Sequence, residues 1–267
     1  MNLPGRSFWE NIKPKADREK VPIKDTIRRA VRMCYGHPKE FLGMAAVAAL
    51  PPFLMMLLIM AQDPENRMSP EQGMVGLLSL ILVIASFVLL MYYVGAIPLL
   101  TANILDDRSM GWTEGFGWVR DRDLFWGVFL ALLLTGFAAL GGLILLILPG
   151  LIFGTWYMLS VPARVLGGFP GREALSESRR LIEPTLWGSM GLGALLTLPV
   201  LLLAWGTQIA FAWMFGFTAT SPARVIAPAI VTYAVAIFWG PVAIIGLTLH
   251  YLDKSGGLEA QRADLFL

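Results

Sequence analysis

Four long tracts without a charged side chain set the strongest limit on how this chain can fold. They cover residues 72–105, 124–163, 184–223 and 225–252. A helix needs about 20 apolar residues to cross a bilayer, so every tract is long enough for one crossing and the second and third are long enough for two. Only 15% of the residues are charged and 56% are hydrophobic, whereas about a quarter of the residues of a soluble domain are charged. The sequence therefore predicts an all-α, polytopic helical membrane protein.

One predicted transmembrane helix precedes these tracts and the tracts divide into five more, which makes six helices arranged as three hairpins. The predicted spans are residues 41–61, 74–103, 124–148, 151–167, 186–215 and 225–251. Spans three and four share one tract, and we place their turn at Pro149–Gly150, because a proline followed by a glycine ends a helix and reverses the chain. A turn at Gly141–Gly142 would divide the tract more evenly. The predicted membrane domain covers residues 23–253, between a flexible basic tail at 1–22 and a second tail at 254–267.

Lys and Arg residues are distributed unequally between the two sides of this topology. Residues 1–40, 104–123, 164–185 and 252–267 fall on one side and hold ten, three, four and two of the 21 basic residues. Only Arg67 and Arg224 fall on the other side. Because cytoplasmic loops of membrane proteins carry an excess of Lys and Arg, both chain ends are predicted to be cytoplasmic.

The residues before the first span have the pattern of an amphipathic helix. Ile23, Ile27, Ala30, Val31 and Cys34 recur on one helical face, and Lys24, Arg28, Arg29 and Arg32 fall on the opposite face. Such a helix is expected at the cytoplasmic interface, where its cations would contact anionic lipid headgroups. The alternative is that these residues only enforce the topology and pack under the bundle.

Two further stretches before odd-numbered spans have related patterns. Before the fifth span, Ala174, Leu175, Ser178, Leu181 and Ile182 share a face opposite charged residues that include Arg179 and Arg180. Before the third span, Trp112, Phe116 and Val119 have helical spacing. Gly115 and Gly117 weaken that second prediction, since each glycine costs about 1 kcal/mol in a helix. Each hairpin is thus predicted to follow a cytoplasmic amphipathic helix, and Arg179 and Arg180 are predicted contacts for anionic lipid headgroups.

Aromatic, glycine and proline positions suggest a threefold repeat. An aromatic residue and then a glycine open each odd-numbered span, at Phe41 with Gly43, Trp126–Gly127 and Trp187–Gly188. Each returning span contains a proline, at Pro98, Pro162 and Pro241. Proline removes a helical hydrogen bond, so these residues are expected to kink their helices and could shape a central cavity. The alternative is that proline is simply common in transmembrane helices.

A set of small, aromatic and proline positions extends through the second half of the chain. They are Leu148–Pro149–Gly150, Trp156, Pro162, Ala174–Leu175, Ser178, Leu181 and Trp187, with Tyr251–Leu252–Asp253 further on. This pattern resembles that of a large group of bacterial integral membrane proteins. The group is similar to the membrane domain of glycerophosphoryl diester phosphodiesterases and includes stand-alone six-helix proteins of unknown function. The resemblance implies a location in the bacterial inner membrane.

The sequence departs from that family pattern in two respects. Gly167–Gly168 stands where the pattern has an acidic residue, and no phosphodiesterase barrel is present in this sequence. The hydrolase activity of the fused relatives is therefore not expected here.

Candidate catalytic and metal-binding residues are sparse. His37 and His250 belong to no metal-ligand array, and the acidic pairs at Asp106–Asp107 and at Asp121 with Asp123 alternate with arginines, which is typical of solvated loops. We therefore predict no catalytic residue, no metal and no cofactor. Arg164 is the only charge close to the apolar body of a span, where it would either snorkel to the surface or bind a lipid phosphate.

The function expected from these features is that of a non-catalytic membrane protein. It would be an accessory subunit of a membrane complex or a factor in lipid organisation, with membrane lipids and other membrane subunits as partners and no nucleic acid. The alternative is a passive or lipid-type transporter with a central cavity. Such a cavity would be lined by Pro98, Pro162, Pro241, Arg164 and Gln208.

Overall fold

All of the regular structure in the described residues is helical. The computed structural model describes residues 22–60, 70–106, 111–121, 124–145, 147–215 and 222–256. Its helices are α2 (Ile23–Gly36), α3 (Pro38–Met60), α4 (Pro70–Leu105), α5 (Trp112–Asp121), α6 (Leu124–Leu145), α7 (Ile147–Tyr157), α8 (Ser160–Val165), α9 (Gly171–Ile182), the short η1 (Glu183–Thr185), α10 (Leu186–Phe215) and α11 (Pro222–Ser255). Nearly all of the two predicted tails lies outside the described residues, as do Arg67, Asp107 and Asp123.

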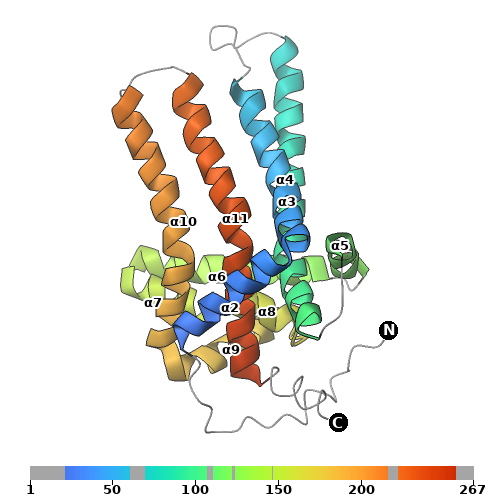
Figure 1. The fold of residues 1–267 in the computed structure, drawn as a ribbon, viewed down its shortest axis with the longest axis vertical. Coiled ribbons are helices and arrows are strands. Elements are labelled where there is room, and N and C mark those ends of the chain that lie inside the picture. The colour runs from blue at the N-terminus through green and yellow to red at the C-terminus, as the bar shows by residue number, and fades with distance from the viewer. Residues whose placement is uncertain are drawn as a thin grey trace.

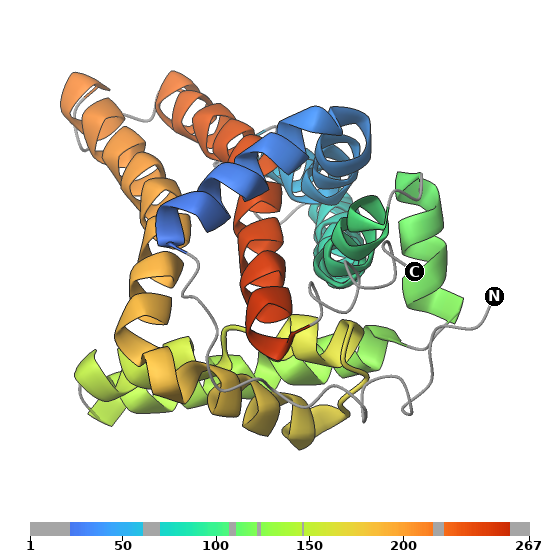
Figure 2. The same cartoon turned by 60° about the horizontal axis from the view of Figure 1, so that its bottom comes forward.

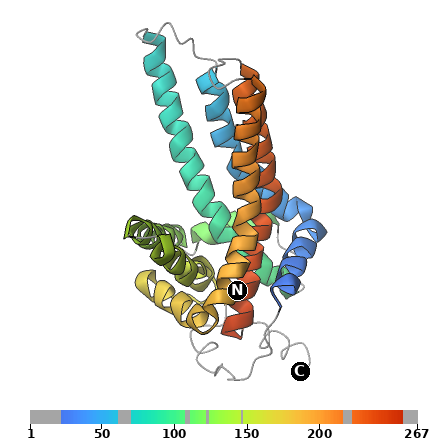
Figure 3. The same cartoon turned by 90° about the vertical axis from the view of Figure 1, so that its left-hand side faces the viewer.

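The helices form two regions. The long helices α3, α4, α10 and α11 run along the long axis of the molecule (Figure 1). The shorter helices α2, α5, α6, α7, α8 and α9 surround one end of them, and we call this set the collar. Figure 3 shows the same division from the side, with the collar at the lower end of the upright long helices. Beyond the collar, the four-helix region consists of the α3–α4 pair and the α10–α11 pair.

The helices α6 and α7 lie across the long helices. They run horizontally in Figure 1, and after the rotation in Figure 2 they still run along one side of the collar. They pack tightly on each other, since a Cβ atom added to Gly142 would lie 2.7 Å from the backbone nitrogen of Gly150. A side chain at position 142 would therefore overlap the backbone of α7, and glycine allows the two helices to approach closely.

The predicted turn at Pro149–Gly150 is wrong. The helix α6 ends at Leu145 and α7 runs through both Pro149 and Gly150. Proline is compatible with this position, because the first turn of a helix has backbone N–H groups without intrahelical acceptors. Gly141–Gly142 is not the turn either, because both residues lie within α6.

The fourth predicted span, residues 151–167, is not one helix. Its residues are divided between α7, which ends at Tyr157, and α8, which begins at Ser160. Pro162 is the third residue of α8, so the interruption precedes the proline that was expected to kink this span. By contrast, Pro98 lies within the continuous helix α4 and Pro241 within the continuous helix α11.

Five helical segments in the described chain are long and apolar enough to cross a membrane. They are Pro38–Leu58, Gly73–Leu105, Leu124–Gly142, Gly171–Met214 and Pro228–Ser255. A chain with this many apolar helices is a multi-pass helical membrane protein.

Burial is concentrated where the collar surrounds the long helices. In α4, Leu80 and Ile84 are exposed, whereas Ile97 and Leu100 are fully buried. In α11, Val242, Ile245 and Leu249 are buried in the same way. The core of the protein is therefore formed by one end of the long helices together with the collar.

Candidate functional site

The outer face of α2 carries a row of cations. Lys24, Arg28 and Arg32 are exposed and follow one another at intervals of four residues. No ion pair joins them to any other residue in the described part of the chain. The opposite face buries Thr26, Ala30 and Cys34. We call Lys24, Arg28 and Arg32 the α2 row.

Contacts with the long helices fix the orientation of the α2 row. The side chain of Ile23 lies close to Gly191 of α10, and the Tyr35 hydroxyl donates a 3.4 Å hydrogen bond to the Phe238 carbonyl of α11. Arg29, beside the row, lies 4.0 Å from the Asp253 carboxylate. Because α2 is held at both ends, its cations stay on the outside of the collar.

The predicted lipid-contacting cations of α9 are engaged within the protein. Arg180 makes two hydrogen bonds to the Glu177 carboxylate, of 2.8 and 2.7 Å. The Arg179 guanidinium lies 3.3 Å from the Glu183 carboxylate and 4.3 Å from the centre of the Trp156 ring. These two arginines are therefore less available to a phosphate than the α2 row.

The side chain of Ser178 holds the break between α7 and α8. Its hydroxyl donates a 2.7 Å hydrogen bond to the Trp156 carbonyl and accepts a 3.1 Å hydrogen bond from the Leu159 amide. A helix interruption leaves backbone groups without partners, and such groups are costly when buried. The sequence pattern places Ser178 on an otherwise apolar helical face. A hydroxyl at that position is the feature of the sequence that could have indicated a hydrogen bond between this face and the backbone of a neighbouring segment.

Arg164 of α8 points toward α6. Its guanidinium occupies the space that a side chain at Gly127 would need, with Cζ only 2.7 Å from the position of a Cβ atom there. The Arg164 Nε atom is buried and has no hydrogen-bond partner among the described residues. The aromatic–glycine pair Trp126–Gly127 thus has a local explanation, since the glycine leaves room for an arginine of another helix.

The residues expected to line a central cavity differ in burial. Pro98, Pro162 and Pro241 are buried, while Gln208 lies on the exposed surface of α10. Large side chains such as Ile97 and Ile245 belong to the packed core of the same region as Pro98 and Pro241.

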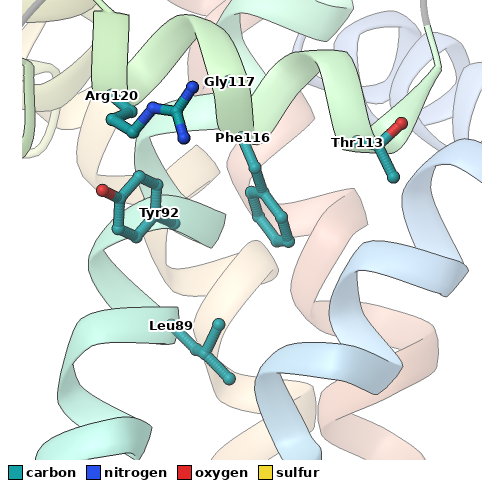
Figure 4. Close-up of a pocket in the computed structure, with 6 residues that line it drawn as sticks. All are labelled: Leu89, Tyr92, Thr113, Phe116, Gly117 and Arg120. Carbon is teal, nitrogen blue, oxygen red and sulfur yellow. The ribbon is translucent and has the colours of Figure 1, made fainter.

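An open groove of about 420 Å³ lies between α4 and α5. Figure 4 shows its lining, which consists of Leu89, Tyr92, Thr113, Phe116, Gly117 and Arg120. Tyr92 and Phe116 meet edge to face with ring centroids 6.0 Å apart. The exposed Arg120 guanidinium lies 3.2 Å from the neighbouring Asp121 carboxylate, and such exposed pairs contribute at most about 1 kcal/mol. The groove therefore combines an apolar wall with a cation that is free to rearrange.

The sequence did not indicate this groove, because Gly115 and Gly117 weakened the helix predicted here and because a groove between two helices depends on tertiary contacts. In the structure both residues lie in α5. A Cβ atom at Gly115 would lie 3.3 Å from Met44 and 3.5 Å from Ala96, so this glycine brings α5 close to α3 and α4. A Cβ atom at Gly117 would meet no atom within 4 Å, so this glycine leaves the groove open.

A serine–histidine contact links α10 and α11. The distance between Ser189 Oγ and His250 Nε2 is 3.0 Å. Ser189 is fully buried, so a substrate has no access to its hydroxyl. The described residues contain no group of three or more His, Cys, Asp or Glu side chains that could hold a metal ion. We interpret this contact as a structural link between two helices.

No protein-family model matches this chain, and no curated protein and no solved structure is significantly similar to it. The geometry identifies the class, a multi-pass helical membrane protein with a packed collar. The family resemblance of the sequence motifs remains a prediction.

Proposed function

We propose that this protein is a non-catalytic membrane component that binds anionic phospholipid at its cytoplasmic face. The α2 row is the observation that carries this proposal, because it presents three exposed cations without ion-pair partners in the described chain. The inner-membrane location and the kinship with bacterial six-helix membrane proteins belong to the same proposal. Both rest on the sequence motifs.

The spacing of the α2 row is suited to contact with a layer of lipid headgroups. Residues four apart on a helix have Cβ atoms about 6 Å apart, so Lys24, Arg28 and Arg32 form a line about 12 Å long. Each cation close to an anionic bilayer surface contributes about 1 kcal/mol of attraction. Since α2 is held against the long helices, little backbone order has to be gained on binding.

The distribution of basic residues supports a cytoplasmic position for the collar. Most of the described Lys and Arg residues lie on collar helices: Lys24, Arg28, Arg29 and Arg32 on α2, Arg120 on α5, Arg164 on α8, and Arg172, Arg179 and Arg180 on α9. By the positive-inside rule the collar faces the cytoplasm. That is also the side on which anionic lipid attracts basic segments.

The α4–α5 groove supports a lipid as the ligand. Leu89 and Tyr92 line it from α4, and Arg120 lies at its edge on α5 (Figure 4). Apolar side chains of this kind fit an acyl chain, and an arginine fits a phosphate. Above Leu89 the exposed face of α4 continues with Ile84 and Leu80, so an acyl chain in the groove would extend along apolar surface.

Two other functions have less support. For a transporter, the residues expected to line a cavity include the buried Pro98 and Gln208 on the exposed surface of α10. For an accessory subunit, the exposed apolar side chains of α4 and α10 suit either lipid or partner helices. Lipid binding is favoured because it also explains the unpaired cations of α2.

The test is the double substitution Arg28→Gln with Arg32→Gln. Loss of two cations at about 1 kcal/mol each should lower the retention of phosphatidylglycerol relative to phosphatidylethanolamine by roughly 30-fold. The retained lipids are measured by mass analysis of protein purified in mild detergent. The matched control, Lys39→Gln with Arg172→Gln, removes the same charge at exposed positions outside the row. Equal lipid retention by the two variants would rule out the α2 row as a lipid site.

A further inference from the structure

The outer face of α6 is an apolar ridge. Trp126, Leu130, Leu133, Phe137, Leu140 and Ile144 are all exposed. They are separated by alternating steps of four and three residues, which places them along a single side of the helix. Ile144 near the end of α6 is 86% exposed, and Phe137 in the middle is 64% exposed. A ridge of this size would be costly to leave in water.

The rest of α6 is covered by the collar itself. The Thr135 and Ser160 hydroxyls are 3.0 Å apart and join α6 to α8. At the edge of the ridge, Leu130 is partly exposed and also lies 3.3 Å from the position of a Cβ atom at Gly171, the first residue of α9. The charged side chains of α9, including Arg172 and Glu173, are exposed. The α6–α7 hairpin thus has a polar helix on one side and an uncovered apolar ridge on another.

The contacts of α6 show at which position along the long helices it crosses them. Val128 lies 3.2 Å from the position of a Cβ atom at Gly95 of α4. From Gly95 to Gly73, at the other end of the apolar segment of α4, the helix extends about 33 Å at 1.5 Å per residue. The hydrocarbon core of a bilayer is about 30 Å thick. The part of α4 beyond α6 is therefore sufficient to cross the bilayer by itself.

The same estimate holds for α10. Leu196 contacts α11, where it lies 3.0 Å from the position of a Cβ atom at Gly246. Three residues earlier in α10, the position of a Cβ atom at Gly193 lies 3.3 Å from the sulfur of Met158, between α7 and α8 of the collar. From Leu196 to Phe215 the helix extends about 28 Å. The four-helix region thus has the thickness of a bilayer, and α6 and α7 lie across its edge (Figures 1 and 2).

We infer that the α6–α7 hairpin lies within the leaflet on the collar side without crossing the membrane, with its ridge among the acyl chains. The chain then crosses the bilayer only through α3, α4, α10 and α11. The distribution of basic residues is the same as for six crossings, because a hairpin that returns to its own side leaves loops 104–123 and 164–185 on one side. The lipid contact of the ridge does not depend on the α2 row.

This arrangement gives the protein an asymmetric cross-section in the membrane. On the collar side the hairpin displaces lipid in addition to the four crossing helices, and on the far side only those helices displace it. The hairpin therefore acts as a wedge in one leaflet.

The experiment measures the depth of single labels in vesicles of phosphatidylcholine and phosphatidylglycerol. Leu130→Cys, Phe137→Cys and Ile144→Cys, each in the Cys34→Ala background, carry an environment-sensitive fluorophore that is quenched by spin-labelled lipids of known depth. Seven residues of a crossing helix change depth by about 10 Å. We expect the three labels on α6 to have the same shallow depth within about 5 Å.

The matched control uses Leu195→Cys and Leu202→Cys, which are exposed positions of α10 with the same seven-residue spacing. Their labels should differ in depth by about 10 Å. If the three α6 labels change depth as the α10 labels do, α6 crosses the membrane and the inference is wrong. If quenchers at every depth fail to reach the α6 labels, a protein surface covers the ridge, and acyl chains are excluded as its partner.

Discussion

The four-helix region and the collar are built from the same apolar residue types but are stabilised differently. Within α4, Leu77, Leu80 and Ile84 are exposed in the four-helix region, whereas Ile97 and Leu100 are fully buried inside the collar. In a bilayer, apolar side chains gain little by leaving lipid for protein, so the exposed set needs no protein partner. Apolar composition therefore indicates which helices lie in the membrane. Close packing with the collar determines which of their residues form the core of the protein.

The largest expected effect tests this comparison within one helix. Leu100→Ala should lower the free energy of unfolding by about 3 kcal/mol, because it leaves a cavity in the core. Leu80→Ala, at a position that is 55% exposed, should change it by less than about 0.5 kcal/mol. Denaturant unfolding in mild detergent, followed by tryptophan fluorescence, measures both. Similar losses for the two variants would show that the four-helix region has its own packed core.

A second prediction concerns the contact between α6 and α7 in the collar. Gly142→Val should destabilise the protein by about 2–3 kcal/mol, because the added atoms overlap the backbone of Gly150 and the ring of Phe153. The adjacent control is Gly141→Val, where an added Cβ atom meets no atom within 4 Å. Thermal unfolding of the two variants measures the difference. A stable Gly142→Val protein would contradict the close approach of the two helices.

Ser178 provides a smaller test of the collar. Ser178→Ala should lower stability by about 2 kcal/mol, since it leaves the buried Leu159 amide and the partly buried Trp156 carbonyl without their partner. Ser176→Ala is the matched control, because its hydroxyl bonds an exposed carbonyl of the same helix. Limited proteolysis between α7 and α8 should also become faster in Ser178→Ala alone. Equal proteolysis rates would show that the break is held by other contacts.

The smallest effect concerns a thiol in the collar. Burial raises the pKa of the Cys34 thiol to about 11, so the reactive thiolate is scarce near neutral pH. The folded state keeps this proton while the unfolded state loses it near pH 9, so any contribution of Cys34 to stability is lost as the pH rises from about 9 to 11.

Alkylation of the folded protein near neutral pH measures the reactivity of Cys34. The control is Gly36→Cys in the Cys34→Ala background, which places a thiol at an exposed position where a Cβ atom meets no other atom within 4 Å. The control thiol should react rapidly, and Cys34 should react only after unfolding. Equal rates would mean that α2 does not stay packed against the long helices.

The positions of most helices follow from the sequence. The predicted span 186–215 covers the same residues as α10, and the apolar face predicted for residues 23–34 contains Ala30 and Cys34, which α2 buries. These features depend on hydrophobic periodicity, which is a local property of the chain.

The course of α6 and α7 could not be predicted in the same way. The helix α6 has 22 residues without a charge, which is also the composition of a crossing helix. Its direction depends on contacts that are distant in sequence, such as that of Gly127 with Arg164 and that of Val128 with Gly95. The groove on α5 was missed because glycine lowers helix propensity, although tertiary packing at Gly115 overcomes that preference.

The length of α4 has a mechanical consequence. It is one continuous helix of 36 residues, about 54 Å long, and it reaches from the far side of the four-helix region into the collar. A thinner bilayer favours tilting of such a helix. Each 10° of tilt would displace one end relative to the other by about 9 Å. A change in membrane thickness that tilts α4 would therefore also act on the groove at Tyr92 and Arg120.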